Sequence, residues 1–189
     1  VATNLWVNDW LRTWTEPIYA AGVAPLVLTR GVWAGGQRHG AVLWSSDIRS
    51  SFEELAAQVP LGVHASLSGV PWWTSDVGGF GCHSPESNLS PYMRELIVRW
   101  YQFGCFCSIF RTHGCRKSPP PEPEPAADPC LHGQQSCGGN EVWSYGTTTQ
   151  PLLERYIRVR AALQPYMRAL AHNVSSRGVP TMRPLCWEF

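Results

Sequence analysis

The 189-residue sequence lacks several features that would each direct its function. It has no apolar run of the ~18–20 residues that a membrane-spanning helix needs. Neither charge predominates, because 15 Lys and Arg residues stand against 14 Asp and Glu residues, so no basic stripe predicts binding to nucleic acid. There is no initiator Met and no signal peptide. The chain starts at Val1 and stops within the apolar segment Trp187–Phe189, so we expect both ends to lie inside a longer protein.

Cysteines and glycosylation patterns give little guidance. The chain has seven Cys, an odd number, so at least one is free or pairs outside it. Asn88-Leu89-Ser90 and Asn173-Val174-Ser175 fit the short acceptor pattern for N-glycosylation. These patterns permit a secretory or extracellular location without establishing one, and the oligomeric state stays open.

Aromatic residues, in contrast, are abundant: ten Trp accompany six Tyr and six Phe. Their rings pack against the C–H faces of sugars as well as against other core groups. Trp6, Trp10 and Trp14 recur every four residues and would share one face of a helix, which is typical of a buried stripe. A Trp-rich core is the simpler interpretation of the composition alone.

Short apolar runs alternate with segments of helical periodicity, which favours parallel βα units and an α/β fold. We expect strands at 25–30, 41–44, 70–74 and 105–110. We expect helices at 5–21, from Ser50 or Ser51 towards Gly69, from Pro91 onwards, and from 156 to Gly178 with a bend at Pro165. The Pro-rich stretch 116–140 is typical of a surface insertion, and the tail after Gly178 has a strand-like pattern.

One link is unusual for parallel strands. Only ten residues separate Arg30 from Ala41, too few for a helical crossover. Either a compact loop joins these two strands, or one of them is predicted wrongly.

Polar side chains stand where the predicted strands end: Arg30, then Trp44 and Asp47, then Asp76, then Arg111 and His113. The carboxyl ends of strands build the active site both in a (β/α)8 barrel and in a doubly wound sheet. Carboxylates and guanidinium groups bind sugar hydroxyls, and aromatic rings cover the sugar. Each residue alone has a simpler explanation: Asp47 could cap a helix, Asp76 could bind turn backbone, and His113 could be an ordinary loop residue. Compatible chemistry at four strand ends favours a carbohydrate site.

Cleavage of a glycosidic bond needs two carboxyl groups. One protonates the leaving oxygen, and the other stabilises or captures the cationic sugar. The acid keeps its proton through apolar surroundings or a nearby like charge. Asp47 lies three residues beyond Trp44, so we expect it to sit against an indole and opposite a second carboxylate.

An ordered series of segments resembles glycoside hydrolase family 31, the α-glucosidase and α-xylosidase family. Any one segment is a weak signal, but together they cover most of the chain outside 116–140 and stand in the family's order. They are Leu28-Thr29-Arg30, Trp33-Ala34-Gly35-Gly36-Gln37-Arg38, Trp44-Ser45-Ser46-Asp47, the run from Gly69 to Phe80, Arg99 to Gly104, Ile109 to Gly114, Glu141 to Gly146, and Met182-Arg183-Pro184-Leu185.

The resemblance implies the second half of a (β/α)8 TIM barrel over residues 1–178, with strands five to eight, running into the start of a β-sandwich domain over 179–189. It implies retaining hydrolysis of terminal, non-reducing α-linked glucosyl or xylosyl residues without a metal or other cofactor. By that likeness Asp47 is the general acid/base. Arg30, Asp76 and His113 would bind hydroxyls of the terminal sugar. Trp44 and Phe80 would be aromatic walls, and Arg111 would support His113. The family also has a short link between the first two of these strands.

The chain departs from the family pattern in several places. Ser46 replaces the usual Gly before the acid/base Asp, and Ser108 stands where Pro is common. The insertion 116–140 follows directly on the His113 segment. The family nucleophile, an Asp in a Trp-x-Asp-Met-Asn-Glu-like strand end, has no match, and Asp9 is a poor substitute. We therefore expect this chain alone to bind sugar weakly and not to turn it over.

Two rival interpretations belong to other classes of protein. A carbohydrate-binding remnant would use the same pocket without catalysis. A small metal module would use the clustered Cys105, Cys107, Cys115, Cys130, Cys137, His113 and His132, although their spacing does not match common zinc patterns.

Overall fold

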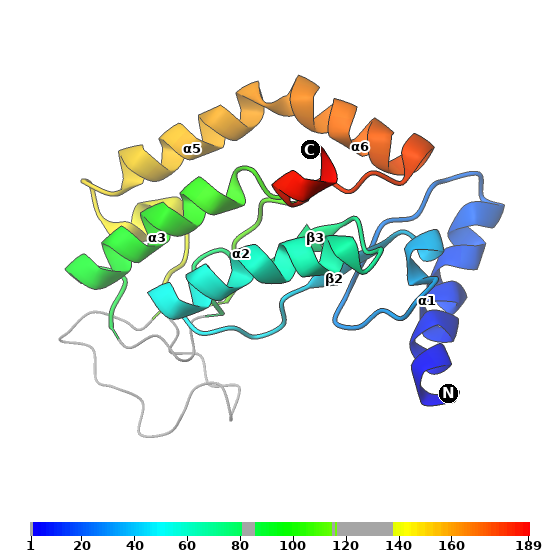
Figure 1. Cartoon of the computed structure of the whole chain (residues 1–189). Coiled ribbons are helices and arrows are strands. Elements are labelled where there is room, and N and C mark those ends of the chain that lie inside the picture. Colours follow the sequence, from blue (N-terminus) through cyan, green and yellow to red (C-terminus); the bar gives the residue numbers. More distant parts are fainter. Residues whose placement is uncertain (1, 81–85, 115, 117–137) are drawn as a thin grey trace.

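The computed structural model describes residues 2–80, 86–114, 116 and 138–189, and it has an α/β fold (Figure 1). Three short parallel strands lie side by side in the order β1 (Val27–Thr29), β2 (Ala41–Trp44) and β3 (Trp73–Thr74). The first three predicted strands are therefore confirmed as elements: β2 has the predicted bounds, and β1 and β3 are shorter than predicted. Because all three run in one direction, their carboxyl ends meet at the same edge of the sheet.

A compact loop joins β1 to β2. Residues 30–40 contain one 3-10 turn, η1 (Gly36–His39), and no crossover helix. Gly40 closes this loop with a φ of 64°, and a Cβ added there would lie 2.1 Å from the Pro25 carbonyl oxygen. Both strands are real, so the compact-loop alternative is the correct one.

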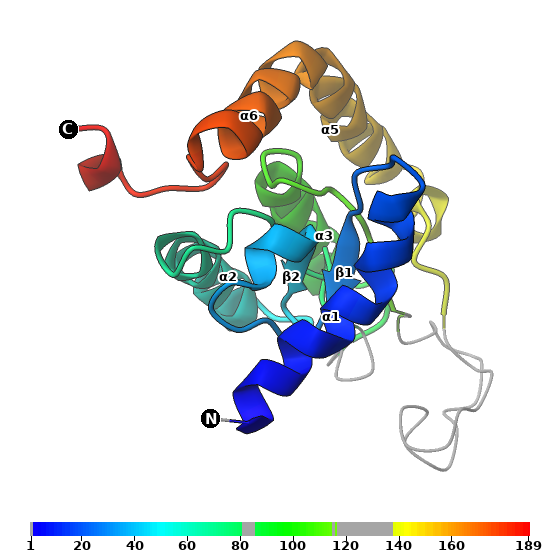
Figure 2. The same cartoon turned by 90° about the vertical axis from the view of Figure 1, so that its right-hand side faces the viewer.

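Five α-helices are described: α1 (Ala2–Ala20), α2 (Phe52–Leu67), α3 (Pro91–Gly104), α5 (Gln150–Ala162) and α6 (Gln164–Arg177). In both views α5 and α6 arch over the rest of the chain (Figures 1 and 2). They meet at Leu163, two residues before Pro165, where the sequence predicted a bend in a single long helix.

Side-chain caps set the starts of two helices. Ser51, rather than Ser50, caps α2, because its Oγ accepts a hydrogen bond from the Glu54 amide at 3.2 Å. Ser90 caps α3 through the Met93 amide at 3.1 Å, and Pro91 follows at the first helical position. Both helix starts thus follow from local sequence.

The prediction of a fourth strand at 105–110 is wrong. After α3 the chain continues in turns, and Arg160 of α5 donates hydrogen bonds to the carbonyl oxygens of Cys105, Cys107 and Ser108 at 2.7–2.9 Å. Because these carbonyls face a side chain, they cannot form a strand ladder. Within the described ranges, a single parallel bridge, between Val77 and Thr112, continues the sheet beyond β3.

The strand-like tail is also absent. Residues 179–189 form bends and one 3-10 turn, η3 (Leu185–Trp187), among the described residues. Ser108, at a position where the family often has Pro, hydrogen-bonds Thr181, whose hydroxyl donates to the Pro71 carbonyl at 3.2 Å. The tail is therefore fastened to the segment that leads into β3. Of the proposed insertion 116–140, residues 117–137 lie outside the described part of the chain.

The Trp stripe of α1 is exposed rather than buried. Trp6, Trp10 and Trp14 are 65%, 40% and 59% exposed. The helix instead packs through Leu11 and Thr15, both fully buried, at the same spacing of four but about 100° around the helix. The four-residue spacing of the Trp residues correctly predicted a helix, but in this structure the Trp residues do not lie on its packed face.

The apolar core lies directly beneath the loops that follow β2 and β3. Ile48 and Val77, each one residue beyond a candidate site Asp, join side chains of α3, α5 and η2 (Val142–Tyr145). The buried members of this core are Ile48, Val77, Met93, Leu96, Ile97, Trp100, Tyr101, Tyr145 and Leu153. Each of the two loops is thus held in place by one buried apolar side chain, Ile48 after β2 and Val77 after β3.

Two surface-related expectations can be checked on the described residues. No helix among them is long and apolar enough to cross a bilayer. Asn88 of the first glycosylation pattern is 5% exposed and donates to the Gly139 carbonyl at 3.2 Å, so the folded chain hides this acceptor. Asn173 is half-buried within α6.

Candidate active site

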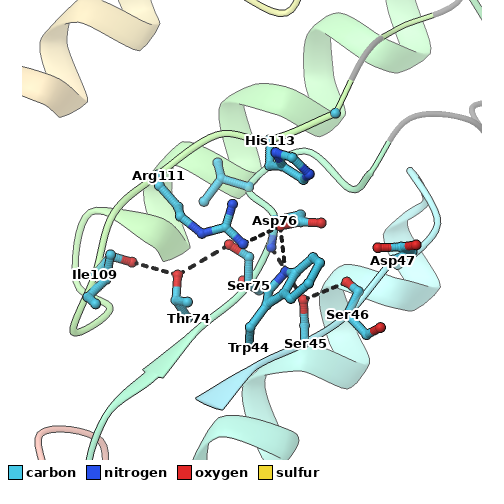
Figure 3. A network of polar contacts seen from close by, with 12 residues as sticks. Trp44, Ser45, Ser46, Asp47, Thr74, Ser75, Asp76, Ile109, Arg111 and His113 are labelled. Atoms are coloured by element: carbon cyan, nitrogen blue, oxygen red, sulfur yellow. Dashed lines mark hydrogen bonds and ion pairs between the residues drawn. The ribbon is translucent and has the colours of Figure 1, made fainter. Parts of the chain in front are cut away.

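The predicted site residues gather at the carboxyl ends of the parallel strands (Figure 3). Trp44 is the last residue of β2, and Asp76 lies two residues beyond β3. Arg111 and His113 flank Thr112, which bridges to Val77. Neighbouring parallel strands therefore bring together side chains that are up to 69 residues apart in the sequence, from Trp44 to His113.

Trp44 is the hub of this arrangement. Its indole Nε1 donates a hydrogen bond to Asp76 Oδ1 at 2.7 Å. The guanidinium carbons of Arg30 and Arg111 lie 4.6 Å and 5.4 Å from the centre of its ring, within the range of cation–π attraction. The His113 ring meets it edge-on at 6.0 Å. We call these five residues, Arg30, Trp44, Asp76, Arg111 and His113, the Trp44 cluster.

Asp76 is fully buried, and its two oxygens differ in their surroundings. Oδ1 accepts from Trp44 and, at 2.5 Å, from Arg111 Nη2. Oδ2 is buried and has no hydrogen-bond partner among the described residues. Arg111 is expected from the sequence to support His113, but its hydrogen bond goes to Asp76 instead. A buried carboxylate oxygen without a donor is costly, so Oδ2 is an open acceptor for a ligand hydroxyl or a water.

The backbone around Asp76 is held by a residue that the sequence analysis did not single out. Ser45 Oγ accepts a hydrogen bond from the Asp76 amide at 3.4 Å, and the Ser45 amide donates to the Thr74 carbonyl at 3.0 Å. Ser45 lies between Trp44 and Asp47, inside a segment that resembles the family. This position was the feature of the sequence that could have identified it as a site residue.

Asp47 lies on the exposed side of the site. Its Oδ1 accepts a hydrogen bond from Arg30 Nη2 at 2.9 Å, and the Asp47 side chain is 41% exposed. Asp47 is expected to face a second carboxylate, but among the described residues its hydrogen bond comes from Arg30. Ser46, just before it, has a φ of 66°, a left-handed conformation that favours Gly. A Ser at this position, where the sequence departs from the Gly of the family pattern, therefore carries a cost in backbone energy.

Phe80 and His113 form one wall of the site. Their ring centroids are 5.4 Å apart at an angle of 36°. The Phe80 amide donates to the Ile48 carbonyl at 2.8 Å, which ties this wall to the loop that carries Asp47. Through Phe80–His113, His113–Trp44 and Arg30–Asp47, all seven predicted site residues belong to one connected set of contacts.

The groups present suit sugar chemistry rather than metal binding. Carboxylates and guanidiniums of both signs, with aromatic rings beside them, match the paired donors and acceptors of sugar hydroxyls. The described residues contain no group of three or more His, Cys, Asp or Glu side chains placed to hold a metal ion. Of the residues in the metal interpretation, Cys105 and Cys107 are buried free thiols. Cys115, Cys130, Cys137 and His132 lie outside the described part.

Comparisons with known proteins show which family this chain resembles. The model of the glycosyl hydrolases family 31 TIM-barrel domain matches residues 3–131. An α-xylosidase of Saccharolobus solfataricus is 37% identical over 164 residues, which are 87% of this chain and 19% of that protein. α-Xylosidase A of Aspergillus niger is 32% identical over 187 residues, 97% of this chain and 24% of that protein.

A solved structure resembles the fold over nearly the whole chain. The crystal structure of a family 31 α-xylosidase from a soil metagenome, complexed with xylose, superposes with a TM-score of 0.81 and 35% identity. The match covers 96% of this chain and 26% of that one, so the chain spans about a quarter or less of its relatives' length. The family model, these relatives and the matching solved structure agree: the chain belongs to glycoside hydrolase family 31, and residues 3–131 match the TIM-barrel domain of that family.

Proposed function

We propose that this chain supplies the general acid/base and much of the sugar-binding pocket of a retaining α-glycosidase. The full-length protein would remove terminal, non-reducing α-linked glucosyl or xylosyl residues. Relatives named α-xylosidase and α-glucosidase support this reaction class. Residues 1–178 would form the second half of the catalytic barrel, and residues 179–189 would open the β-sandwich domain that follows.

The observation that supports the proposal most strongly is the hydrogen bonding of the two carboxylate oxygens of Asp76. Its Oδ1 accepts hydrogen bonds from Trp44 and Arg111, while its buried Oδ2 has no partner in the part of the chain that the structure describes. A hydroxyl of the terminal sugar would supply the missing donor. Because a site built to bind a hydroxyl leaves its own polar group unpaired when that hydroxyl is absent, Asp76 would contribute strongly to selection of the sugar.

His113 and Arg30 complete the contacts to the sugar in this proposal. His113 lies edge-on to Trp44 and beside Phe80, so its ring nitrogens would reach hydroxyls next to the aromatic wall. Arg30 holds Asp47 with one Nη2 contact and retains further N–H donors for the substrate. Arg111 would act through Asp76, as a positioning residue.

Asp47 would exchange one proton in each of two steps. In the first, its carboxyl group protonates the leaving oxygen as the glycosidic bond breaks, while a carboxylate nucleophile forms a bond to the sugar. In the second, Asp47 takes a proton from the water that attacks this glycosyl-enzyme. Asp47 Oδ2 has no protein partner among the described residues, so it is free to carry the proton, while Arg30 orients Oδ1.

The nucleophile would come from outside this chain. Asp9 does not suit the role, because it lies on exposed α1 and pairs with Arg12 at 3.3 Å. Without the nucleophile the chain would bind sugar weakly and would not turn it over. A carbohydrate-binding remnant remains the alternative if the full-length protein has no second carboxylate facing Asp47.

The test is an Asp47→Ala variant of the full-length protein, with Asp9→Ala as the matched control. Loss of the acid should slow cleavage of unactivated α-linked disaccharides by about 10²–10⁴-fold. Nitrophenyl α-glucoside or α-xyloside should be much less affected at the first step, because nitrophenolate leaves without protonation. Asp9→Ala should change neither. An equal fall on both substrate types, or no fall on either, would refute the assignment of Asp47.

A further inference from the structure

A buried arginine outside the Trp44 cluster holds the turn that follows Asp76. Arg116 is 1% exposed. Its Nη1 donates to the Gly79 carbonyl at 2.8 Å and its Nη2 to the Val77 carbonyl at 3.4 Å. A Cβ added at Gly78 would lie 2.3 Å from Nη2, so the guanidinium packs directly against this turn. Arg116 thereby fixes the backbone on which Asp76 and Phe80 stand.

The same arginine connects to the segment that carries His113. Its Nε donates to the Tyr145 hydroxyl at 2.8 Å, and this hydroxyl donates to Asn140 Oδ1 at 2.6 Å. Asn140 Nδ2 then donates to the carbonyls of His113 and Gly114 at 3.0 Å and 3.1 Å. We call Arg116, Tyr145 and Asn140 the Arg116 relay.

Burial and backbone hydrogen bonds hold the side chains of the Arg116 relay in fixed positions. Tyr145 is fully buried, and burial raises the pKa of its phenol, so the hydroxyl keeps the proton that it donates to Asn140. The Arg116 backbone pairs with Gly138 through two hydrogen bonds of 3.0 Å and 2.5 Å, which anchors the arginine itself. Gly114 lies so close to Phe80 that an added Cβ would fall 1.6 Å from the Phe80 carbonyl oxygen. The backbone of the His113 segment is thus packed directly against the backbone at Phe80.

We propose that the Arg116 relay positions Asp76, Phe80 and His113 for binding of the terminal sugar. This inference rests on the proposed function, and it assigns a role to three residues that touch no substrate in that proposal. Among the described residues, the relay bonds to the two segments end on carbonyls within three residues of Asp76 and on those of His113 and Gly114. Because Asp76 and His113 lie on different segments, paired in the sheet among the described residues by the single bridge from Val77 to Thr112, their relative placement depends on such a cross-link. Misplacement by about 1 Å can lower activity a hundredfold.

Tyr145→Phe and Asn140→Ala test this role in the full-length enzyme. Tyr145→Phe keeps the ring in the core and removes only the oxygen that joins Arg116 to Asn140. Asn140 is partly exposed, so its truncation perturbs folding less. Tyr101→Phe is the matched control, because it removes a phenol oxygen from the same core and, among the described residues, Tyr101 makes no hydrogen bond to the relay.

The measurements are kcat and KM on nitrophenyl α-glucoside and α-xyloside, and inhibition by free glucose and xylose. We expect both relay variants to raise KM and the monosaccharide inhibition constant about tenfold, with kcat changed by less than about threefold. The double variant should be no worse than the stronger single one, because both changes break one relay. Tyr101→Phe should leave KM and the inhibition constant within about twofold of wild type.

The outcomes separate this inference from the proposed function. An active wild type whose relay variants melt earlier but keep KM and the inhibition constant would overturn the positioning role alone. The same holds if Tyr101→Phe raises KM as much as Tyr145→Phe. A full-length wild type that cleaves neither glycoside and binds neither sugar would overturn the proposed function, and the positioning role with it.

Discussion

Replacing Ser46 by glycine should stabilise the protein, although glycine usually destabilises a folded chain. Ser46 is the one non-glycine residue with a positive φ among the described residues, at 66°. A left-handed conformation costs a residue with a Cβ roughly 1–2 kcal/mol. The extra chain entropy of glycine opposes this by roughly 0.5–1 kcal/mol. Ser46 makes no side-chain hydrogen bond among the described residues, and its carbonyl contact with Ser45 Oγ survives the change. The net gain should be about 0.5–1 kcal/mol.

Ser45→Gly is the matched control, one residue away. It adds the same chain entropy without relieving a positive φ, and it removes the hydroxyl that accepts from the Asp76 amide. It should destabilise the protein by about 1–2 kcal/mol. Urea denaturation of the full-length protein, followed by Trp fluorescence, should order the midpoints as Ser46→Gly, wild type, Ser45→Gly. If Ser46→Gly lowers the midpoint as Ser45→Gly does, the strain assigned to Ser46 is absent.

Two further changes follow from the site and the core. Trp44→Phe keeps an aromatic ring but removes the 2.7 Å hydrogen bond to Asp76, worth about 1.5–3 kcal/mol, so KM should rise about ten- to hundredfold; an unchanged KM would contradict the hub role of Trp44. Burial raises the pKa of the Cys107 thiol to about 12, so iodoacetamide at pH 8 should label exposed Cys186 while Cys107 reacts only after unfolding. Mass spectrometry of tryptic peptides checks this order, and early modification of Cys107 would show that its surroundings are open.

Local patterns in the sequence predicted much of the fold. Ser51 and Ser90 have capping side chains whose effect extends only three residues, so both helix starts could be predicted. The site residues were identifiable because each stands within a segment that resembles the family; parallel pairing of β1, β2 and β3, and the bridge from Val77 to Thr112, bring these segments together. The structure connects all seven, which the sequence could only suggest.

The failures all depend on contacts between distant segments. The run 105–110 is apolar enough for a strand, but Arg160, more than fifty residues later, binds its carbonyls in a turn. The α1 stripe has the right period, but polar residues such as Thr15 lie on the packed face. Arg116 lies at the edge of the Pro-rich stretch that was predicted as a surface insertion, and nothing in its local sequence indicated the hydrogen bonds that it makes. No local pattern identifies such partners.

The most direct test of the account is a crystal structure of the full-length protein with xylose or glucose bound. Asp76 Oδ2 should accept a hydrogen bond from a sugar hydroxyl at about 2.5–3.0 Å, with His113 and Arg30 around the same ring and Asp47 near its anomeric oxygen. A sugar bound elsewhere, or Asp76 Oδ2 occupied by a donor from the protein itself, would contradict the account.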